Sequence, residues 1–232
     1  MKEPQTGRLC DTVPNLALES RWREYQEEGN KVDTNNLFEL GWLGYERSDT
    51  IKLLAAKADE YAGKGLSEWD TVSVFVEPVV RGLGWDTLDI RQVNRESRRR
   101  EQLGDLNLLV SDEEGRKKLA VLIEAKQLDR SELDPSARQL QRDINERFLR
   151  PTQEGYNPGL RLEREGKVLL RGALTNGRRW LVYDFTAECS ARWNAGSLIG
   201  EFDISALNDE AARSIGEALG RNSILRWLRL QR

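Results

Sequence analysis

The spacing of apolar residues changes at Gly84, and this change restricts the fold more than any other feature of the chain. Before Gly84, apolar residues recur at every third or fourth position, which is typical of helices. After it, short apolar runs separated by turn residues predict strands over residues 88–93, 106–110, 119–125, 168–174 and 180–185. Residues 132–148 have a helical period instead and predict an amphipathic helix between the third and fourth strands. The resulting order, α-β-β-β-α-β-β, predicts an α/β fold with helical additions at both ends.

Helical patterns occupy both ends of the chain. The first of these regions ends at Gly65, and Ser67 begins a new helix that runs to about Leu83. Two short helices are expected over residues 209–219 and 223–230. We therefore expect three parts: an N-terminal helical extension (1–65), a core (66–186) and a C-terminal helical extension (187–232).

The composition excludes several classes of chemistry. The chain has 232 residues and no histidine, which removes Ser-His-Asp and Cys-His catalysis and every histidine-ligated metal site. Cys10 and Cys189 are too few for a disulfide framework or a multi-cysteine zinc site. No apolar run approaches the roughly 18 residues that a membrane helix needs, and no Gly-rich phosphate loop is present. We expect a cytoplasmic protein without a membrane partner, whose chemistry depends on carboxylates, lysine, arginine or hydroxyls.

Charged residues stand at matching positions on two neighbouring predicted strands. Asp105 precedes the second strand, and Glu124 and Lys126 stand at the end of the third. The turn signal at Glu114-Gly115 lies midway between positions 105 and 124, so an antiparallel hairpin places Asp105 opposite Glu124. Because side chains alternate along a strand, Lys126 shares a face with both carboxylates. Three charged groups are therefore expected to converge on one side of an apolar hairpin.

Such a convergence favours a metal site. Two carboxylates in a semi-buried place repel each other unless a cation or a shared proton relieves them, and Mg²⁺ prefers oxygen ligands. A metal ion polarises a phosphoryl oxygen and stabilises the leaving oxygen, while a neighbouring lysine orients a water or helps to deprotonate it. The pattern therefore indicates phosphodiester hydrolysis, although charges at strand ends are also common without any function.

The same residues resemble the signature of the PD-(D/E)XK nuclease superfamily, an Asp on one strand followed by Glu-x-Lys on the next. Asp105 and Glu124-Ala125-Lys126 match it, with Gly104 at the place of the eponymous proline. Flanking segments also resemble the nuclease domain in the N-terminal region of type I restriction R subunits: residues 67–71, 77–78, 83–86 and 174–177, with Trp180 and Tyr183. The resemblance covers roughly residues 67–185. It implies a restriction-endonuclease-like core with a central mixed β-sheet flanked by helices.

The resemblance also implies roles for individual residues. Asp105 and Glu124 would bind Mg²⁺, for which Mn²⁺ can substitute, with the Ala125 carbonyl as a further ligand and Lys126 as the catalytic lysine. A helix carboxylate often completes such sites, and Glu68 is preferred to Glu77, which directly precedes a proline.

Gln139 resembles the helix glutamine that follows the lysine in many of these nucleases, and Gln141 is the less favoured candidate. For Glu68, Glu77 and Gln139 a solvated helix surface is the competing interpretation.

Positive charge is concentrated locally, although the whole chain has a net charge of −3. Five arginines and two glutamates lie within residues 91–101, directly before Asp105, where they can steer phosphates. We expect Arg178 at the predicted 176–177 hairpin to contribute as well. The predicted nucleic-acid contacts are Arg95, Arg98, Arg99, Arg100 and Arg178.

These observations lead to a primary hypothesis with alternatives. The first is a Mg²⁺-dependent nuclease that hydrolyses DNA phosphodiester bonds in a restriction, mobile-element or repair context, as a homodimer or in a larger restriction-type assembly. A second is a catalytically silent nucleic-acid- or protein-binding module with a nuclease fold. A third is an RNA-directed or toxin-like nuclease, because RNA is not excluded as a substrate.

Overall fold

A six-stranded mixed β-sheet is the centre of the computed structural model, which describes residues 54–95, 105–150, 158–206 and 209–228. The strand order is β1-β2-β3-β6-β7-β9. Strands β3 and β6 are parallel, and all other neighbours are antiparallel. The strands are β1 (Val93–Arg95), β2 (Leu106–Ser111), β3 (Lys117–Ala125), β6 (Arg171–Thr175), β7 (Arg179–Asp184) and β9 (Ser197–Asp203).

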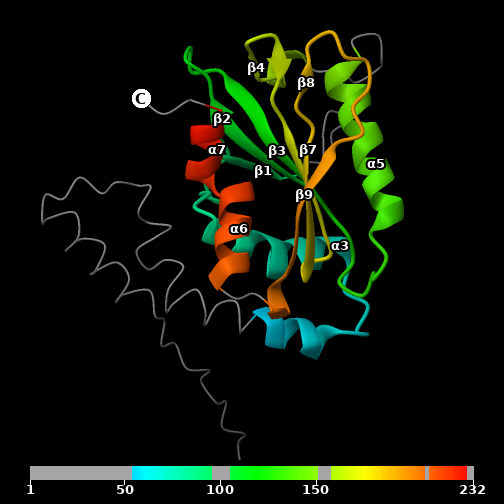
Figure 1. Cartoon of the computed structure of the whole chain (residues 1–232). Coiled ribbons are helices and arrows are strands. Elements are labelled where there is room, and N and C mark those ends of the chain that lie inside the picture. The colour runs from blue at the N-terminus through cyan, green and yellow to red at the C-terminus, as the bar shows by residue number, and fades with distance from the viewer. Residues whose placement is uncertain (1–53, 96–104, 151–157, 207–208, 229–232) are drawn as a thin grey trace, which may run out of the picture.

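Helices cover both faces of the sheet, which confirms the predicted mixed sheet between helices (Figure 1). On one face, α5 (Asp134–Ile144) and the π-helical turn η2 (Asn145–Leu149) make the crossover from β3 to β6. On the other lie α4 (Glu77–Gly82), α6 (Asp209–Leu219) and α7 (Arg221–Trp227). The helices before and after the sheet therefore share one face, and α5 has the other.

Each face has its own buried cluster, because side chains alternate along β3. Val121 and Ile123 belong to the cluster that includes α4, α6 and α7. Leu122 belongs to the α5 cluster, together with Leu140 and Ile144. The strand β3 is thus buried on both faces along most of its length.

The helix that precedes the sheet is irregular in its middle. A capping box between Ser67 and Asp70 begins α3 (Glu68–Thr71), and a π-helical stretch η1 (Val72–Val76) joins it to α4. Pro78 stands in the first turn of α4, where its missing N–H is tolerated by the widened turns before it. Gly84, with a φ of +85°, follows the helix as predicted.

Most of the predicted elements are present. Strands 106–110, 119–125 and 180–185 and the helix over 132–148 correspond to β2, β3, β7 and α5 with η2. Asn176-Gly177 connects the β6–β7 hairpin, with Gly177 at a φ of +87°. The helices predicted over 209–219 and 223–230 are α6 and α7. Residues 54–61 are helical, and residues 1–53 of the predicted N-terminal helical extension lie outside the described residues.

The strand predicted over residues 88–93 is wrong. The carboxylates of Asp86 and Asp89 accept hydrogen bonds from the backbone N–H groups of Leu88 and Arg91, both at 2.9 Å. These side-chain turns replace strand pairing, so β1 begins only at Val93.

The predicted strand 168–174 is two strands. Its first part, β5 (Lys167–Val168), pairs with β4 (Glu163–Arg164) and β8 (Ala187–Glu188) in a separate three-stranded sheet. Two short 3-10 turns, η3 (Pro158–Leu160) and η4 (Ile204–Ala206), precede β4 and follow β9 along the chain.

The strand β9 was not predicted from the sequence. It is an edge strand whose apolar residues Leu198 and Ile199 are exposed. Because β9 pairs with β7 and α6 and α7 pack into the core, residues after 186 complete the sheet. None of the helices within the described ranges has the length and apolar character to cross a membrane.

Candidate active site

The β2–β3 hairpin brings the predicted charges together. Leu106 pairs with Ile123, so that the preceding Asp105 lies opposite Glu124, in agreement with the predicted register. The register shifts by one residue between Leu108 and Leu109, which is toward the turn. The shift therefore leaves the end of the hairpin that carries the charges in the predicted alignment.

Hydrogen bonds and an ion pair link the charged side chains directly. Lys126 Nζ donates to Glu124 Oε1 at 2.7 Å and lies 3.6 Å from Glu68 Oε1. Asp105 Oδ2 accepts a hydrogen bond from the Ala125 N–H at 2.6 Å. The structure thus gathers Asp105, Glu124, Lys126 and Glu68, together with the Ala125 backbone.

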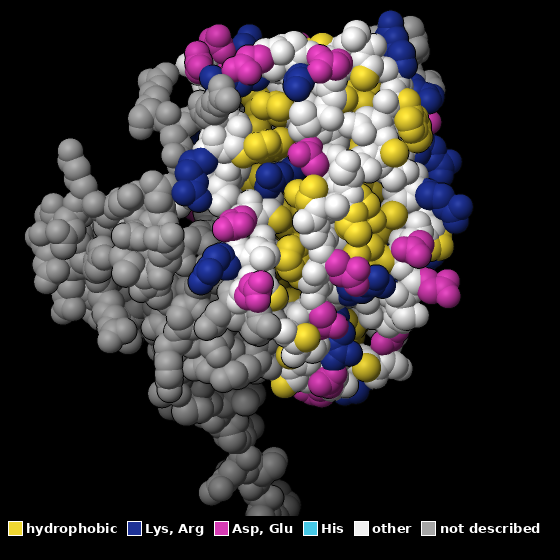
Figure 2. Space-filling model, in the orientation of Figure 1, with side chains coloured by type: hydrophobic (Ala, Val, Ile, Leu, Met, Phe, Trp, Pro, Cys, Tyr) yellow, Lys and Arg dark blue, Asp and Glu magenta, His cyan; other side chains and the backbone are white. Residues whose placement is uncertain are grey.

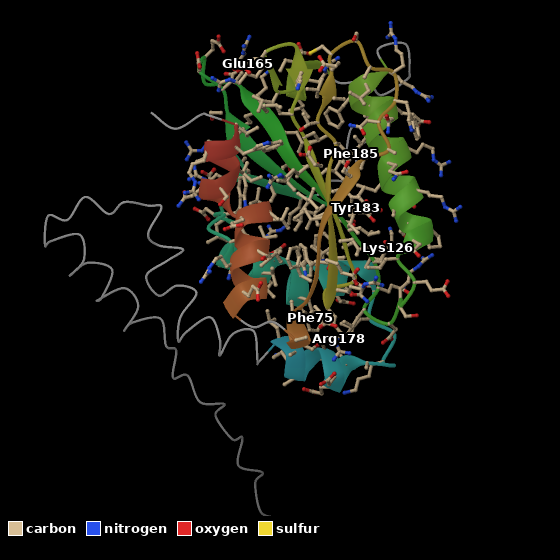
Figure 3. All side chains as sticks on the ribbon, viewed as in Figure 1. Phe75, Lys126, Glu165, Arg178, Tyr183 and Phe185 are labelled. Atoms are coloured by element: carbon tan, nitrogen blue, oxygen red, sulfur yellow. The ribbon has the colours of Figure 1, made fainter. Side chains whose placement is uncertain are left out.

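The cluster lies at one end of the sheet, beside the beginning of α5 (Figure 3). The Lys126 and Glu124 side chains are only 8% and 15% exposed, whereas Glu68 is 45% exposed. The backbone N–H of Lys126 donates to the Thr175 carbonyl at 2.7 Å, which fixes the end of β3 against β6. The lysine and its glutamate are therefore largely shielded from water, and Glu68 approaches them from the solvent side.

Burial and like charges disfavour ionisation of the two strand carboxylates. Desolvation, followed by the charge of Glu124, raises the pKa of Asp105 from 3.8 to about 7, against the opposing Ala125 N–H and Lys126. Desolvation also raises the pKa of Glu124, although the hydrogen bond from Lys126 opposes it. The cluster carries carboxylates that a cation would relieve.

Lys126 is held as an ammonium ion. Desolvation acts to lower its pKa, but the hydrogen bond and charge of Glu124, with the charges of Glu68 and Asp105, outweigh desolvation and raise it. Lys126 is therefore a fixed positive charge and a hydrogen-bond donor in this arrangement.

Helix α5 adds a carboxylate that the sequence reading missed. The charge of Asp143, a half-buried residue on the flank of α5, contributes to raising the pKa of Glu124. Desolvation raises the pKa of Asp143 itself, against the charges of Arg147 and Arg142 and a hydrogen bond with Gln139. The helical period would have placed Asp143 beside the apolar stripe, one turn after Gln139.

Gln139 lies on the exposed surface of α5, and its side chain hydrogen-bonds Asp143. Its connection to the cluster therefore runs through Asp143. Gln141 is half-buried on α5, where its carbonyl accepts from Asn145 Nδ2 at 2.6 Å.

Glu77 is directed elsewhere. It is 8% exposed and accepts from Arg95, whose Nη2 lies 2.7 Å from Glu77 Oε2, while Arg95 Nε contacts the other oxygen. Glu68, not Glu77, thus faces Lys126. The same pair occupies Arg95, one of the predicted phosphate contacts.

The other predicted nucleic-acid contacts divide into two groups. Arg178 donates to Asp59 and, at 2.9 Å, to Ser205 Oγ. Arg98, Arg99 and Arg100 lie outside the described residues.

Cations that the sequence reading did not select lie on α5. Lys and Arg side chains gather along the side of the molecule that α5 occupies (Figure 2). Arg138 and Arg142 are both exposed there, four residues apart on the outward side of the helix. These two arginines give an exposed positive surface to α5, the helix that follows Lys126 along the chain.

The donor set fits a hard divalent ion that keeps part of its hydration shell. In the described part of the chain, no three Asp, Glu or Cys side chains gather closely enough to hold an ion by themselves. Asp105 and Glu124 each have one carboxylate oxygen engaged by a donor of the chain, which leaves the other oxygen for a ligand role. Mg²⁺ commonly binds through one or two carboxylates and keeps several waters. These residues fit an ion of that kind.

Comparison of the chain with family models, with curated proteins and with solved structures finds no match.

Proposed function

We propose that this protein is a Mg²⁺-dependent nuclease that hydrolyses DNA phosphodiester bonds. The observation that carries the proposal is the alignment of Asp105 and Glu124 across a hairpin, with Lys126 hydrogen-bonded to Glu124. Carboxylates with raised pKa values beside a buried lysine are typical of functional sites rather than of surface charge. A purely structural hairpin end gains nothing from two half-buried acids placed opposite each other.

The element order supports a restriction-endonuclease-like core of the PD-(D/E)XK type. A helix, three antiparallel strands, the crossover helix α5 and the β6–β7 hairpin follow one another along the chain. The crossover makes β6 parallel to β3 and thereby backs the strand that carries Glu124 and leads into Lys126.

The roles of the side chains follow from their positions. Asp105 and Glu124 would hold Mg²⁺ or Mn²⁺ through their remaining oxygens, with the Ala125 carbonyl as a further ligand. When bound, the ion supplies charge stabilisation at the phosphoryl and leaving oxygens. The Lys126 ammonium group donates a hydrogen bond to the attacking water or to a phosphate oxygen, and so orients the group that it bonds. Glu68, whose side chain is 45% exposed, would accept a proton from that water.

The substrate surface proposed for the DNA backbone is the side of α5 that carries Arg138 and Arg142. Arginines at a surface bind phosphates without reading bases, which agrees with the absence of a base-reading motif in the sequence. We propose that Arg98, Arg99 and Arg100 also contact the DNA backbone.

The test is a cleavage assay on supercoiled, linear and single-stranded DNA and on RNA, with Mg²⁺, Mn²⁺ or EDTA. Lys126→Ala is compared with Lys118→Ala, which removes a lysine at the other end of the same strand. We expect metal-dependent cleavage of DNA that Lys126→Ala abolishes and Lys118→Ala retains.

If both variants cleave DNA as fast as the wild type does, the cleavage comes from a contaminant. Metal-dependent binding of DNA without cleavage would support the silent-module alternative, and preferential cleavage of RNA would replace DNA as the substrate.

A further inference from the structure

A buried asparagine next to the charged cluster has an amide oxygen without a donor. Asn107 lies on β2, is 5% exposed, and its Oδ1 has no hydrogen-bond partner within the described part of the protein. Buried polar atoms are nearly always paired, so an orphaned acceptor calls for a specific reason.

Its place in the strand points toward the cluster. Asn107 follows Asp105 by two residues and therefore shares its face of the sheet, the face covered by α5. It pairs with Leu122, which makes Glu124 its diagonal neighbour across the hairpin. The orphaned amide is thus next to both carboxylates proposed to hold the ion.

Packing does not explain an asparagine at this place. Its cross-strand partner Leu122 and the next residue on the same hairpin face, Leu109, both belong to the apolar cluster under α5. A leucine would continue that cluster without leaving a polar atom unpaired.

A second buried asparagine shows what a structural role looks like. Asn145 is fully buried, and its Nδ2 donates to the carbonyls of Gln141 and Asn194 at 2.6 and 2.7 Å. Its Oδ1 accepts from the Asn194 N–H at 2.6 Å. Asn145 is satisfied entirely by the chain, whereas the oxygen of Asn107 is not.

The waters bound to an ion that two carboxylates hold provide the missing hydrogen-bond donor. Such an ion retains several waters, whose protons need acceptors. Asp105 and Glu124 already accept from the Ala125 N–H and from Lys126. We propose that Asn107 is a positioning residue of the site, whose Oδ1 accepts a hydrogen bond from a water in the hydration shell of the divalent ion. This inference rests on the proposed function.

The experiment measures binding and folding separately, on the full-length protein. Mn²⁺ affinity is measured by the loss of the free-ion signal in electron paramagnetic resonance, and stability of the metal-free protein by urea unfolding. The variants are Asn107→Leu, Asn107→Asp, Asn145→Leu and Asp105→Asn. Asn145→Leu is the matched control, because it removes a buried asparagine that the chain itself satisfies.

We expect Asn107→Leu to weaken Mn²⁺ binding by about 10- to 100-fold, which is the usual effect of an outer-shell change. It should leave the urea midpoint of the metal-free protein equal or higher. Asn107→Asp keeps an acceptor at this position and should keep the affinity. Asn145→Leu should lower the urea midpoint and leave the affinity of the folded fraction unchanged.

Two results would overturn the inference. If Asn107→Leu binds Mn²⁺ as the wild type does, while Asp105→Asn has lost binding, Asn107 has no role and the proposed ion site stands. If the wild type and Asp105→Asn bind Mn²⁺ equally weakly, the proposed function itself fails and the inference fails with it.

Discussion

The two ends of the β2–β3 hairpin both carry clustered charges, but they treat them in opposite ways. At the turn, Asp112 accepts hydrogen bonds from the N–H and the Nε of Arg116, both at 2.8 Å. Desolvation of Asp112 is outweighed by these hydrogen bonds, and its pKa is lowered. At the other end, burial and Glu124 raise the pKa of Asp105 to about 7. The turn therefore stabilises the ionised form of its carboxylate, whereas the opposite end disfavours the ionised form of Asp105.

The difference shows which kind of charge cluster supports a functional interpretation. Acidic and basic side chains lie at both ends, and a hollow of about 460 Å³ even lies at the turn end, beside Asp112, Arg161 and Arg164. The hollow therefore favours a site at the turn, whereas the raised carboxylate pKa values favour a site at the end with Asp105 and Glu124. We place the site at the end with Asp105 and Glu124. Arg116 already stabilises the ionised form of Asp112, whereas a further cation would stabilise the ionised forms of Asp105 and Glu124.

The largest expected difference between the two ends is in cleavage. Asp105→Asn removes a proposed metal ligand and should lower cleavage of DNA by roughly a thousandfold, which corresponds to about 4 kcal/mol. Asp112→Asn should change it by less than about twofold, since surface charges far from the chemistry act weakly. Initial rates at saturating Mg²⁺ would measure both. Equal losses in the two variants would remove the distinction between the ends.

The same pair of variants should change the stability of the metal-free protein in opposite directions. The folded-state pKa of Asp105, about 7, exceeds its unfolded value of 3.8, so its ionisation costs stability as pH rises through this window. At pH 8, Asp105→Asn should therefore raise the free energy of unfolding, by on the order of 2–4 kcal/mol. Asp112→Asn should lower it, because that carboxylate is more acidic when folded.

The measurement is urea unfolding in EDTA between pH 4 and 8. The wild type should gain stability as the pH falls from about 8 to 4, and Asp105→Asn should show less of this gain. The contribution of Asp112 has the opposite sense, since it is lost as the pH falls through its lowered pKa. A wild type whose stability falls steadily from pH 8 to pH 5 would contradict the strained state of Asp105.

Much of this contrast is predictable from the sequence, because it depends on period and register. The alternation of side chains along β3 and the turn at residues 114–115 are sufficient to place Asp105 opposite Glu124. The one-residue register shift lies between that pair and the turn, so it does not disturb the prediction. Local patterns suffice where the elements are regular and apolar.

What the sequence does not show depends on contacts between distant segments. The proline after Glu77 favours Glu68, but the sequence does not show where Glu77 goes. Its ion pair with Arg95, 18 residues away in the sequence, directs it elsewhere. Asp143 reaches Glu124 because α5 packs on the sheet at one angle, which a helical period does not specify. The strand β9 was missed because an exposed edge strand lacks the buried alternation that marks a strand.

Divalent ions offer a smaller test of the same comparison. An ion that binds only the folded protein stabilises it by RT ln(1 + [L]/Kd), about 2.7 kcal/mol at a concentration 100-fold above Kd. Mg²⁺ or Mn²⁺ should therefore raise the thermal midpoint of the wild type and of Asp112→Asn, but not of Asp105→Asn. Ca²⁺ serves as a control for binding without catalysis. A shift that persists in Asp105→Asn would place the ion elsewhere.

The smallest effect is expected from the partner of Asp112. Arg116→Ala removes the guanidinium that bonds both Asp112 and Glu114. Arg116 and Glu114 are 65% and 64% exposed, so water replaces their lost contact, and the 9% exposed Asp112 keeps the backbone N–H groups of residues 114 and 116 as donors. The urea midpoint should fall only slightly, and the difference should shrink further in about 1 M salt, because exposed ion pairs are screened there. Cleavage should be unchanged. A loss of stability comparable to the gain in Asp105→Asn would mean that the turn, like the site, confines its charges away from water.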